Sequence, residues 1–276
     1  MPAIDWTIDQ DWGRYTAAEH AVWHTLFQRQ SRLLTGRACD AFLQGLQALP
    51  MAAQHIPDFA QLNTVLLQRT GWQVVAVPGL VPDAVFFEHL AHRRFPAGRF
   101  VRRADQLDYL QEPDVFHDVF GHVPMLMDPR IADYIQAYGQ GGLRALQLGC
   151  LPLLARVYWY TVEFGLVQQA DGLRLYGAGI ASSMAESRFA LDSPSPNHIQ
   201  FELGRVMRTG YRIDDFQESY FVISGLDALL GLAQIDFAPV YQRISGLPTL
   251  APGSLLASDV VLARGSGAHH AGRAEA

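Results

Sequence analysis

The sequence is short of cysteine and of charge. Only two cysteines, Cys39 and Cys150, occur in 276 residues, and charged residues make up 17% of the chain. Two isolated cysteines cannot form a disulfide framework, which favours a reducing compartment, so we expect a cytoplasmic protein. The 21 basic residues are outnumbered by 27 acidic ones, for a net charge of −6. Nucleic acid is therefore not an expected partner, because it requires a basic face.

Long apolar runs and a basic amino terminus are also missing. No apolar run approaches the roughly 20 residues that a membrane span needs, so no membrane partner is expected. Residues 1–11 contain three aspartates and no lysine or arginine, which does not fit a secretory signal peptide. Hydrophobic residues, by contrast, are abundant and make up 49% of the chain. A chain of this length and composition can bury a sizeable core.

Helix signals dominate the sequence. Thr16 and Glu19 form a capping box, and Asp58 and Gly71 lie at the start and just past the end of another helical pattern. Helices are predicted over 16–33, 37–49, 58–70, 83–90, 130–148, 151–167, 183–190, 198–207 and 226–233, and short strands over 72–77, 173–176 and 220–223. Glycines at 139, 141 and 142 predict a break in the fifth of these helices.

These patterns predict an α-dominant (α+β) protein: one domain of packed helices with a few short strands. The domain is expected to span residues 1–250, with 1–15 as an arm that packs onto the body. From about Ala251 the sequence becomes small and polar. We therefore predict that residues 251–276 form an extended, disordered tail.

Two histidines stand five residues apart in an apolar stretch, Glu-Pro-Asp-Val-Phe-His-Asp-Val-Phe-Gly-His-Val-Pro, which covers residues 112–124. Pro113 suits a first helical turn. In an ideal α-helix, His122 would be rotated by about 140° from His117. Gly121 and Pro124 favour an early end to the helix, which would let His122 turn back toward His117. We expect both histidines to serve one site.

Glu163 lies within an apolar helical pattern, 151–167, where a lone carboxylate is costly unless it is paired, protonated or bound to a metal. Together with His117 and His122 it completes the donor set of a facial triad, which suits iron(II). Zinc uses the same donors in some hydrolases. Those enzymes usually carry His-Glu-x-x-His, whereas Asp118 follows the first histidine here, so iron is the preferred metal.

Other polar features have ordinary explanations. The remaining histidines are expected at the surface or hydrogen-bonded in the core. Five arginines between 93 and 103 call for an anion or for nearby carboxylates, and most are expected to pair with surface acids. The glycines of Tyr176-Gly177-Ala178-Gly179 are a weak nucleotide signal that nothing downstream supports.

Three motifs make the chain similar to the pterin-dependent aromatic amino acid hydroxylases, and among them to the short bacterial phenylalanine 4-hydroxylases. They are the histidine motif given above, then Tyr-Trp-Tyr-Thr-Val-Glu-Phe-Gly-Leu, then Tyr-Gly-Ala-Gly-Ile-x-Ser-Ser. The similarity runs from about Trp72 to Val222. It implies iron bound by His117, His122 and Glu163, and no side chain is required as a strong general base.

The resemblance also implies a substrate site. Arg102 would hold the amino acid carboxylate, because a guanidinium fork matches a carboxylate. Trp159 lies four residues before Glu163, on the same face of a helix, and would pack on the substrate ring. Pro113 would line the other side of the ring. Ser182 would orient the first histidine and reach the substrate.

For the tetrahydropterin, the resemblance implies stacking on Phe86, with Tyr158 close by. Backbone groups near Leu80 and the carboxyl group of Asp118 would reach the polar edge of the pterin. Without the resemblance, Phe86 and Tyr158 would be ordinary core aromatics.

The chain departs from the mammalian members in two respects. Leu110 stands where they carry a substrate-contacting threonine. Their regulatory domain and tetramerisation helix are also absent, so a monomer is expected.

The resemblance and the donor set together predict a phenylalanine 4-monooxygenase that uses dioxygen, non-haem iron(II) and a tetrahydropterin. One alternative is a zinc-dependent hydrolase that uses the same two histidines and glutamate. The other is a non-catalytic module that binds a pterin or an amino acid, or a helical structural domain.

Overall fold

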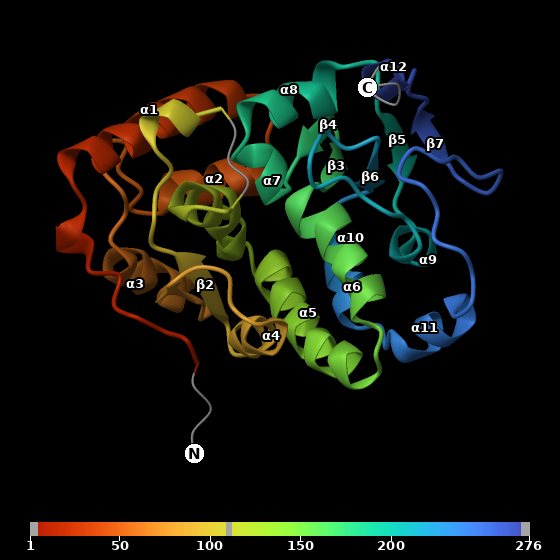
Figure 1. Ribbon diagram of the computed structural model, residues 1–276, viewed down its shortest axis with the longest axis horizontal. Coiled ribbons are helices and arrows are strands. Elements are labelled where there is room, and N and C mark those ends of the chain that lie inside the picture. Colours follow the sequence, from red (N-terminus) through yellow and green to blue (C-terminus); the bar gives the residue numbers. More distant parts are fainter. Residues whose placement is uncertain (1–4, 109–111, 272–276) are drawn as a thin grey trace.

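The computed structural model describes residues 5–108 and 112–271. Packed helices form most of it, and strands form two small sheets, as the sequence predicts (Figure 1). The α-helices are α1 Ala17–Leu34, α2 Asp40–Ala48, α3 Phe59–Thr70, α4 Asp83–Ala91, α5 Pro129–Gln147, α6 Leu151–Tyr158, α7 Ala178–Ala181, α8 Met184–Asp192, α9 Leu203–Met207, α10 Asp227–Ala233, α11 Ala238–Ile244 and α12 Ala268–Ala271. Shorter helical segments are the 3-10 helices η1 Trp12–Arg14, η2 Ala104–Gln106 and η4 Val123–Met127, and the π-helices η3 Phe116–His122 and η5 Trp159–Glu163.

The strands form two separate sheets. The strands are β1 Gln73–Val77, β2 Arg94–Gly98, β3 Leu166–Gln169, β4 Gly172–Leu175, β5 Asn197–Gln200, β6 Ser219–Ile223 and β7 Val261–Ala263. β2 lies near α3 and α4, and the larger sheet lies in the upper right part of the view (Figure 1). β1 and β2 form a parallel pair. The second sheet has the order β4-β3-β6-β5-β7, and it is parallel in the middle and antiparallel at both edges.

The amino-terminal segment packs onto the body through its backbone and its aromatic side chains. Ile8 N–H donates to the Ala76 carbonyl oxygen over 2.9 Å, and Trp12 Nε1 donates to that of Ile56 over 2.7 Å. The capping box of Thr16 and Glu19 starts α1 as predicted. No helix in the two described ranges is long and apolar enough to cross a membrane.

The predicted break in the helix after residue 129 is wrong: α5 runs unbroken through its glycines. These glycines serve packing instead. A Cβ atom on Gly139 would lie 2.4 Å from the Ala91 nitrogen, and one on Gly142 would lie 2.1 Å from the Phe87 ring. Because glycine has no side chain, these two positions let α5 lie directly against α4.

Two other predicted helices are partly wrong. The helix over 151–167 ends at Glu163, and Leu166–Gln169 is a strand. The predicted helix over 198–207 begins as β5, because residues 197–200 pair with β6 and with β7 before α9 starts. In both cases pairing within the five-stranded sheet overrides local helix propensity.

The prediction of a disordered tail is wrong for residues 251–271. β7 joins the sheet beside β5. Asp259 forms an ion pair with Arg205 over 2.9 Å, and the two side chains are only 3% and 4% exposed. A small and polar segment is thus held by a buried charge pair and by strand pairing, neither of which is visible in its composition.

Candidate active site

The two histidines lie on a π-helical segment, η3. A π-helix bonds residue i to residue i+5, so side chains five residues apart lie on nearly the same face. The Nε2 atoms of His117 and His122 are accordingly 3.3 Å apart. The expected break at Gly121 is wrong, because the helix widens rather than ends. Gly121 packs against α7, where a Cβ atom would lie 2.9 Å from the Ala178 carbonyl oxygen.

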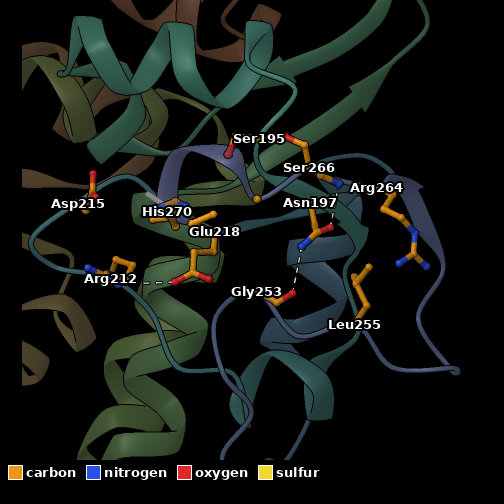
Figure 2. A pocket seen from close by; sticks show the side chains of 13 residues that line it. Ser195, Asn197, Arg212, Asp215, Glu218, Gly253, Leu255, Arg264, Ser266 and His270 are labelled. Atoms are coloured by element: carbon orange, nitrogen blue, oxygen red, sulfur yellow. Dashed lines mark hydrogen bonds and ion pairs between the residues drawn. The ribbon is translucent and has the colours of Figure 1, made fainter. Parts of the chain in front are cut away.

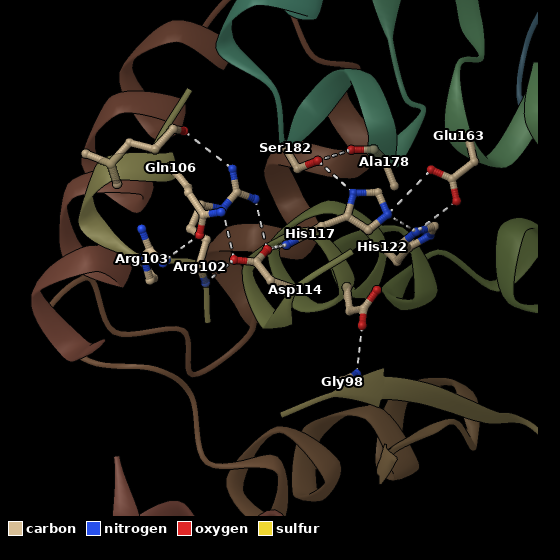
Figure 3. Close-up of polar contacts among 12 residues, drawn as sticks. Gly98, Arg102, Arg103, Gln106, Asp114, His117, His122, Glu163, Ala178 and Ser182 are labelled. Atoms are coloured by element: carbon tan, nitrogen blue, oxygen red, sulfur yellow. Dashed lines mark hydrogen bonds and ion pairs between the residues drawn. The ribbon is translucent and has the colours of Figure 1, made fainter. Parts of the chain in front are cut away.

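Glu163 comes to the same point from a second π-helical turn, η5, which ends α6. Its Oε1 lies 3.2 Å from His122 Nε2, and its Oε2 lies 3.6 Å from His117 Nε2. Figure 3 shows the carboxylate facing both rings. The cluster is formed by residues far apart in the sequence, and its Glu163 side chain is only 13% exposed.

A serine sets the tautomer of His117. Ser182 Oγ–H donates to the Ala178 carbonyl oxygen over 2.8 Å. Ser182 Oγ also lies 2.9 Å from His117 Nδ1 (Figure 3). Since the serine proton is directed to a carbonyl, Nδ1 of the histidine must be the donor to Oγ. Neutral His117 then carries its lone pair on Nε2, which faces Glu163 and His122.

Charges in the cluster favour a bound cation. Burial lowers the pKa of His117 to about 4, so its imidazole is neutral at pH 7. Burial alone would raise the pKa of Glu163, but His122 and His117 hold that pKa below its usual value. The result is a carboxylate and a neutral imidazole whose acceptor atoms point at one place.

The donor set fits a metal ion. Ligand atoms bound at about 2.1 Å on one face of an octahedron lie about 3 Å apart. The three separations here, 3.2, 3.3 and 3.6 Å, are close to that spacing. The Ser182 contact to the outer nitrogen of His117 matches the support that metal-bound histidines usually have. His117, His122 and Glu163 therefore have the chemistry and the arrangement of a two-histidine, one-carboxylate iron site.

A cavity of about 700 Å³ opens beside this cluster. All four predicted substrate residues line it together with His117 and Glu163: Arg102, Pro113, Trp159 and Ser182. A volume of this size holds a small organic ligand. The structure thus brings the predicted substrate residues to one place, next to His117 and Glu163. Leu110 lies outside the described residues.

Arg102 already has a bidentate partner within the protein. Its Nε and one terminal nitrogen donate to the Asp114 carboxylate, each over 2.9 Å, and its other terminal nitrogen reaches the Leu107 carbonyl oxygen. Asp114 is fully buried, and its carboxylate also accepts the backbone N–H of His117 over 3.0 Å. Each terminal nitrogen of Arg102 keeps one further N–H. The predicted fork to a substrate carboxylate must therefore use these two remaining donors.

Of the other four arginines of the 93–103 region, three pair with acids as the sequence suggests, and Arg99 reaches a backbone carbonyl oxygen. Their partners are Asp133 for Arg93, Asp5 for Arg94, the Asp9 carbonyl oxygen for Arg99 and Asp105 for Arg103.

Trp159 is held in one orientation. Its Nε1 donates to Gln217 Oε1 over 3.0 Å, and its ring stacks on Tyr211 with centroids 4.2 Å apart. Gln217 is buried and also donates to the Arg212 carbonyl oxygen. Sequence reasoning missed Gln217, Tyr211 and the role of Asp114. Only Asp114 had a signal, its place inside the histidine motif.

The predicted pterin residues are brought together only in part. Phe86 meets Tyr158 edge-on, with centroids 5.9 Å apart, and Tyr158 stacks on His122 at 6.3 Å. Asp118 accepts the Gly98 N–H over 2.7 Å, and burial raises the pKa of Asp118 to about 7. Leu80 is 77% exposed on the loop after β1, and no described contact joins it to the other three.

The fold and the site together define a class of protein: biopterin-dependent aromatic amino acid hydroxylases. The model of that family matches residues 11–236, and the chain belongs to it. A relative from Caulobacter vibrioides, named phenylalanine-4-hydroxylase, is 61% identical over 96% of this chain and 90% of its own length.

Two solved structures of the Chromobacterium violaceum phenylalanine hydroxylase have the same fold. The one bound to iron and phenylalanine has a TM-score of 0.90, 53% identity, and coverage of 94% of this chain and 95% of that one. The one with iron(III) and oxidised 7,8-dihydrobiopterin has a TM-score of 0.91, 55% identity and 94% coverage of both chains.

Proposed function

We propose that this chain is a phenylalanine 4-monooxygenase, which hydroxylates L-phenylalanine to L-tyrosine with dioxygen, non-haem iron(II) and a tetrahydropterin. The observation that carries this function is the convergence of His117, His122 and Glu163 beside a cavity that Trp159 lines. The relatives named above, which share more than half of their residues with this chain, support the same reaction.

His117, His122 and Glu163 would hold the iron. When bound, iron(II) and the reduced pterin supply the redox chemistry that activates dioxygen. The chain supplies placement: Ser182 keeps a proton on Nδ1 of His117, which leaves Nε2 free to bind the metal. No side chain of the cluster is needed as a general base.

The cavity would orient the amino acid. The two remaining N–H groups of Arg102 would bind the substrate carboxylate, while Asp114 fixes the guanidinium plane. The ring of phenylalanine would lie between Trp159 and Pro113, which line the same cavity as Glu163. Ser182, which lines the same cavity, would also reach the substrate.

The pterin would stack on Phe86, near Tyr158, with the backbone near Leu80 and the carboxyl group of Asp118 at its polar edge. The ring contacts of Tyr158 with His122 and with Phe86 support this position, because they bring two of the proposed pterin residues close to a proposed metal ligand. We also propose a cytoplasmic monomer, for which the unpaired state of both cysteines is the supporting observation on location.

The direct test supplies iron(II)-loaded protein, a tetrahydropterin, air and phenylalanine, and measures tyrosine and pterin oxidation. Tyrosine formation that requires iron, oxygen and pterin together supports the function, and His122→Ala should abolish it. No tyrosine and no pterin oxidation would overturn it. Activity that survives zinc substitution and needs neither oxygen nor pterin would identify a hydrolase. Competition among phenylalanine, tyrosine and tryptophan in a single turnover gives the ring preference.

A further inference from the structure

A second group of potential metal ligands lies at the carboxy-terminal end of the described chain. Asp215, His269 and His270 each place one ligand atom within 4.8 Å of the others. Asp215 belongs to the loop before β6, and the two histidines belong to α12. Figure 2 shows Asp215 and His270 at the cavity that the loop and α12 share. None of the three residues belongs to the proposed iron site.

The carboxy-terminal segment is fixed in place, so this proximity is built into the fold. Backbone N–H groups of Ser266 and Gly267 donate to the carbonyl oxygens of Pro194 and Ser195 over 2.9 and 3.0 Å. The backbone N–H of His269 donates to Ser195 Oγ over 3.0 Å. The His269 ring then packs against Phe216, with centroids 5.2 Å apart. Both histidines are half-buried rather than free in solvent.

The hydrogen bonds of the group resemble those of a metal site. His269 Nε2 lies 2.9 Å from Asp215 Oδ1, so a proton now occupies the line between them. His270 Nε2 donates to the Phe216 carbonyl oxygen over 2.9 Å, which leaves its lone pair on Nδ1. A histidine whose other nitrogen is bonded to a backbone carbonyl is the usual arrangement around a bound metal.

We infer that Asp215, His269 and His270 form a second metal site, for a zinc-type divalent cation, which ties α12 to the loop before β6. Two imidazoles and one carboxylate are zinc ligands, whereas magnesium and calcium prefer oxygen donors. Ligand atoms on a tetrahedral zinc lie about 3.3 Å apart, so His269 and Asp215 need to separate only slightly. The zinc replaces the proton on His269 Nε2, and that proton leaves to solvent.

Zinc bound at the second site would also affect the substrate cavity, because the loop that carries Asp215 lines that cavity. Asp215, Phe216 and Gln217 are consecutive and all line the cavity beside Glu163. Gln217 also holds Trp159 through its Oε1 atom. Zinc at the second site fixes the backbone next to Gln217, so it reduces the mobility of the loop that supports the substrate pocket.

Zinc stoichiometry distinguishes the two sites. Equilibrium dialysis with zinc and metal analysis should give two ions per chain for the parent protein. His122→Ala and the double variant His269→Ala/His270→Ala should each give one, and the combined triple variant none. His92→Ala, which removes an exposed histidine outside both groups, is the matched control and should give two. Two ions in the double variant, or none in His122→Ala, would overturn the second site.

The double histidine variant could lose zinc only because α12 unfolds. Asp215→Asn excludes this explanation, because it keeps the shape of the side chain and weakens only its binding to zinc. Its zinc affinity at the second site should fall at least about tenfold, with an unchanged melting temperature for the metal-free protein. Zinc should also slow hydrogen exchange of residues 211–217 in the parent but not in this variant. Equal exchange with and without zinc would overturn the link to the loop. These readouts do not depend on tyrosine formation, so they stand apart from the proposed function.

Discussion

Ser182 lies directly behind His117, with Oγ 2.9 Å from Nδ1 and its own proton directed to the Ala178 carbonyl oxygen. This geometry allows only one neutral tautomer of His117, the one with its lone pair on Nε2, which faces Glu163 and His122. A hydroxyl group outside the cluster therefore decides which nitrogen is available to a cation.

Replacing Ser182 with alanine should weaken metal binding without removing a ligand. We expect about 10- to 100-fold lower iron(II) affinity, the usual cost of losing such a support, and a small change in the free energy of unfolding. Anaerobic iron titration measures the affinity. Ser245→Ala, at an exposed helix end, is the control and should bind iron as the parent does. Parent-like affinity in Ser182→Ala would show that His117 needs no partner at Nδ1.

The Arg102–Asp114 pair is a buried ion pair, with side chains 8% and 0% exposed. Asp114→Ala leaves a guanidinium without its partner and removes the acceptor for the His117 backbone, so we expect a loss of about 3–5 kcal/mol in the free energy of unfolding. Urea denaturation measures this loss. Asp105→Ala breaks the exposed pair with Arg103 and should cause no measurable change.

Arg102→Lys tests the proposed substrate contact separately, because lysine keeps the charge but not the fork. The Michaelis constant for phenylalanine should rise more than tenfold, while that for the pterin changes little. An equal rise for both substrates would point to general damage to the pocket and contradict a direct role for Arg102.

The sequence predicted the proximity of Glu163 to the two histidines, because a carboxylate in an apolar helix is costly unless it is paired, protonated or bound to a metal, and the family motifs name the histidines as its partners. It was not sufficient for the way the histidines meet. We expected Gly121 to end the helix, whereas the segment widens into a π-helix while Gly121 packs on Ala178. That choice depends on contact with α7, which is distant in the sequence. The role of Gln217 behind Trp159 was missed for the same reason.

The carboxy-terminal segment shows the limit of composition as evidence. Residues after Ala251 are small and polar, yet Asp259 pairs with Arg205, 54 residues upstream. A buried charge pair of this kind has no local pattern in the sequence. Helix caps, by contrast, are local, and the predicted starts at Thr16 and Asp58 are confirmed.

The glycines of α5 give a matched pair of mutations. Gly139→Ala places a methyl group 2.4 Å from the backbone of α4, which cannot move aside like a flexible side chain, so we expect a loss of about 1–3 kcal/mol or more in stability. Gly141→Ala meets nothing within 4 Å and should gain up to about 1 kcal/mol from helix propensity. Thermal unfolding of both variants measures the difference. Equal effects would mean that α4 and α5 are not in close contact.

Glu186 should make stability fall as pH rises. Its carboxyl group is buried and accepts a hydrogen bond from the Tyr220 hydroxyl, and burial raises the pKa of this carboxyl group from its ordinary 4.5 to about 7. Between pH 4.5 and 7 the folded state therefore holds a proton that the unfolded state releases, so each rise in pH favours unfolding. The loss is complete above pH 7 and amounts to at most about 3 kcal/mol.

Glu186→Gln removes the titration and keeps an acceptor for Tyr220. The free energy of unfolding of the parent relative to this variant should decrease between pH 4.5 and pH 7 and stay constant above pH 7. Urea denaturation across that range measures it. Glu88→Gln, in an exposed pair with His92, is the control and should not reproduce the effect. A difference that is constant with pH would mean that Glu186 is ionised in the folded protein and that the Tyr220 hydroxyl stabilises its charge.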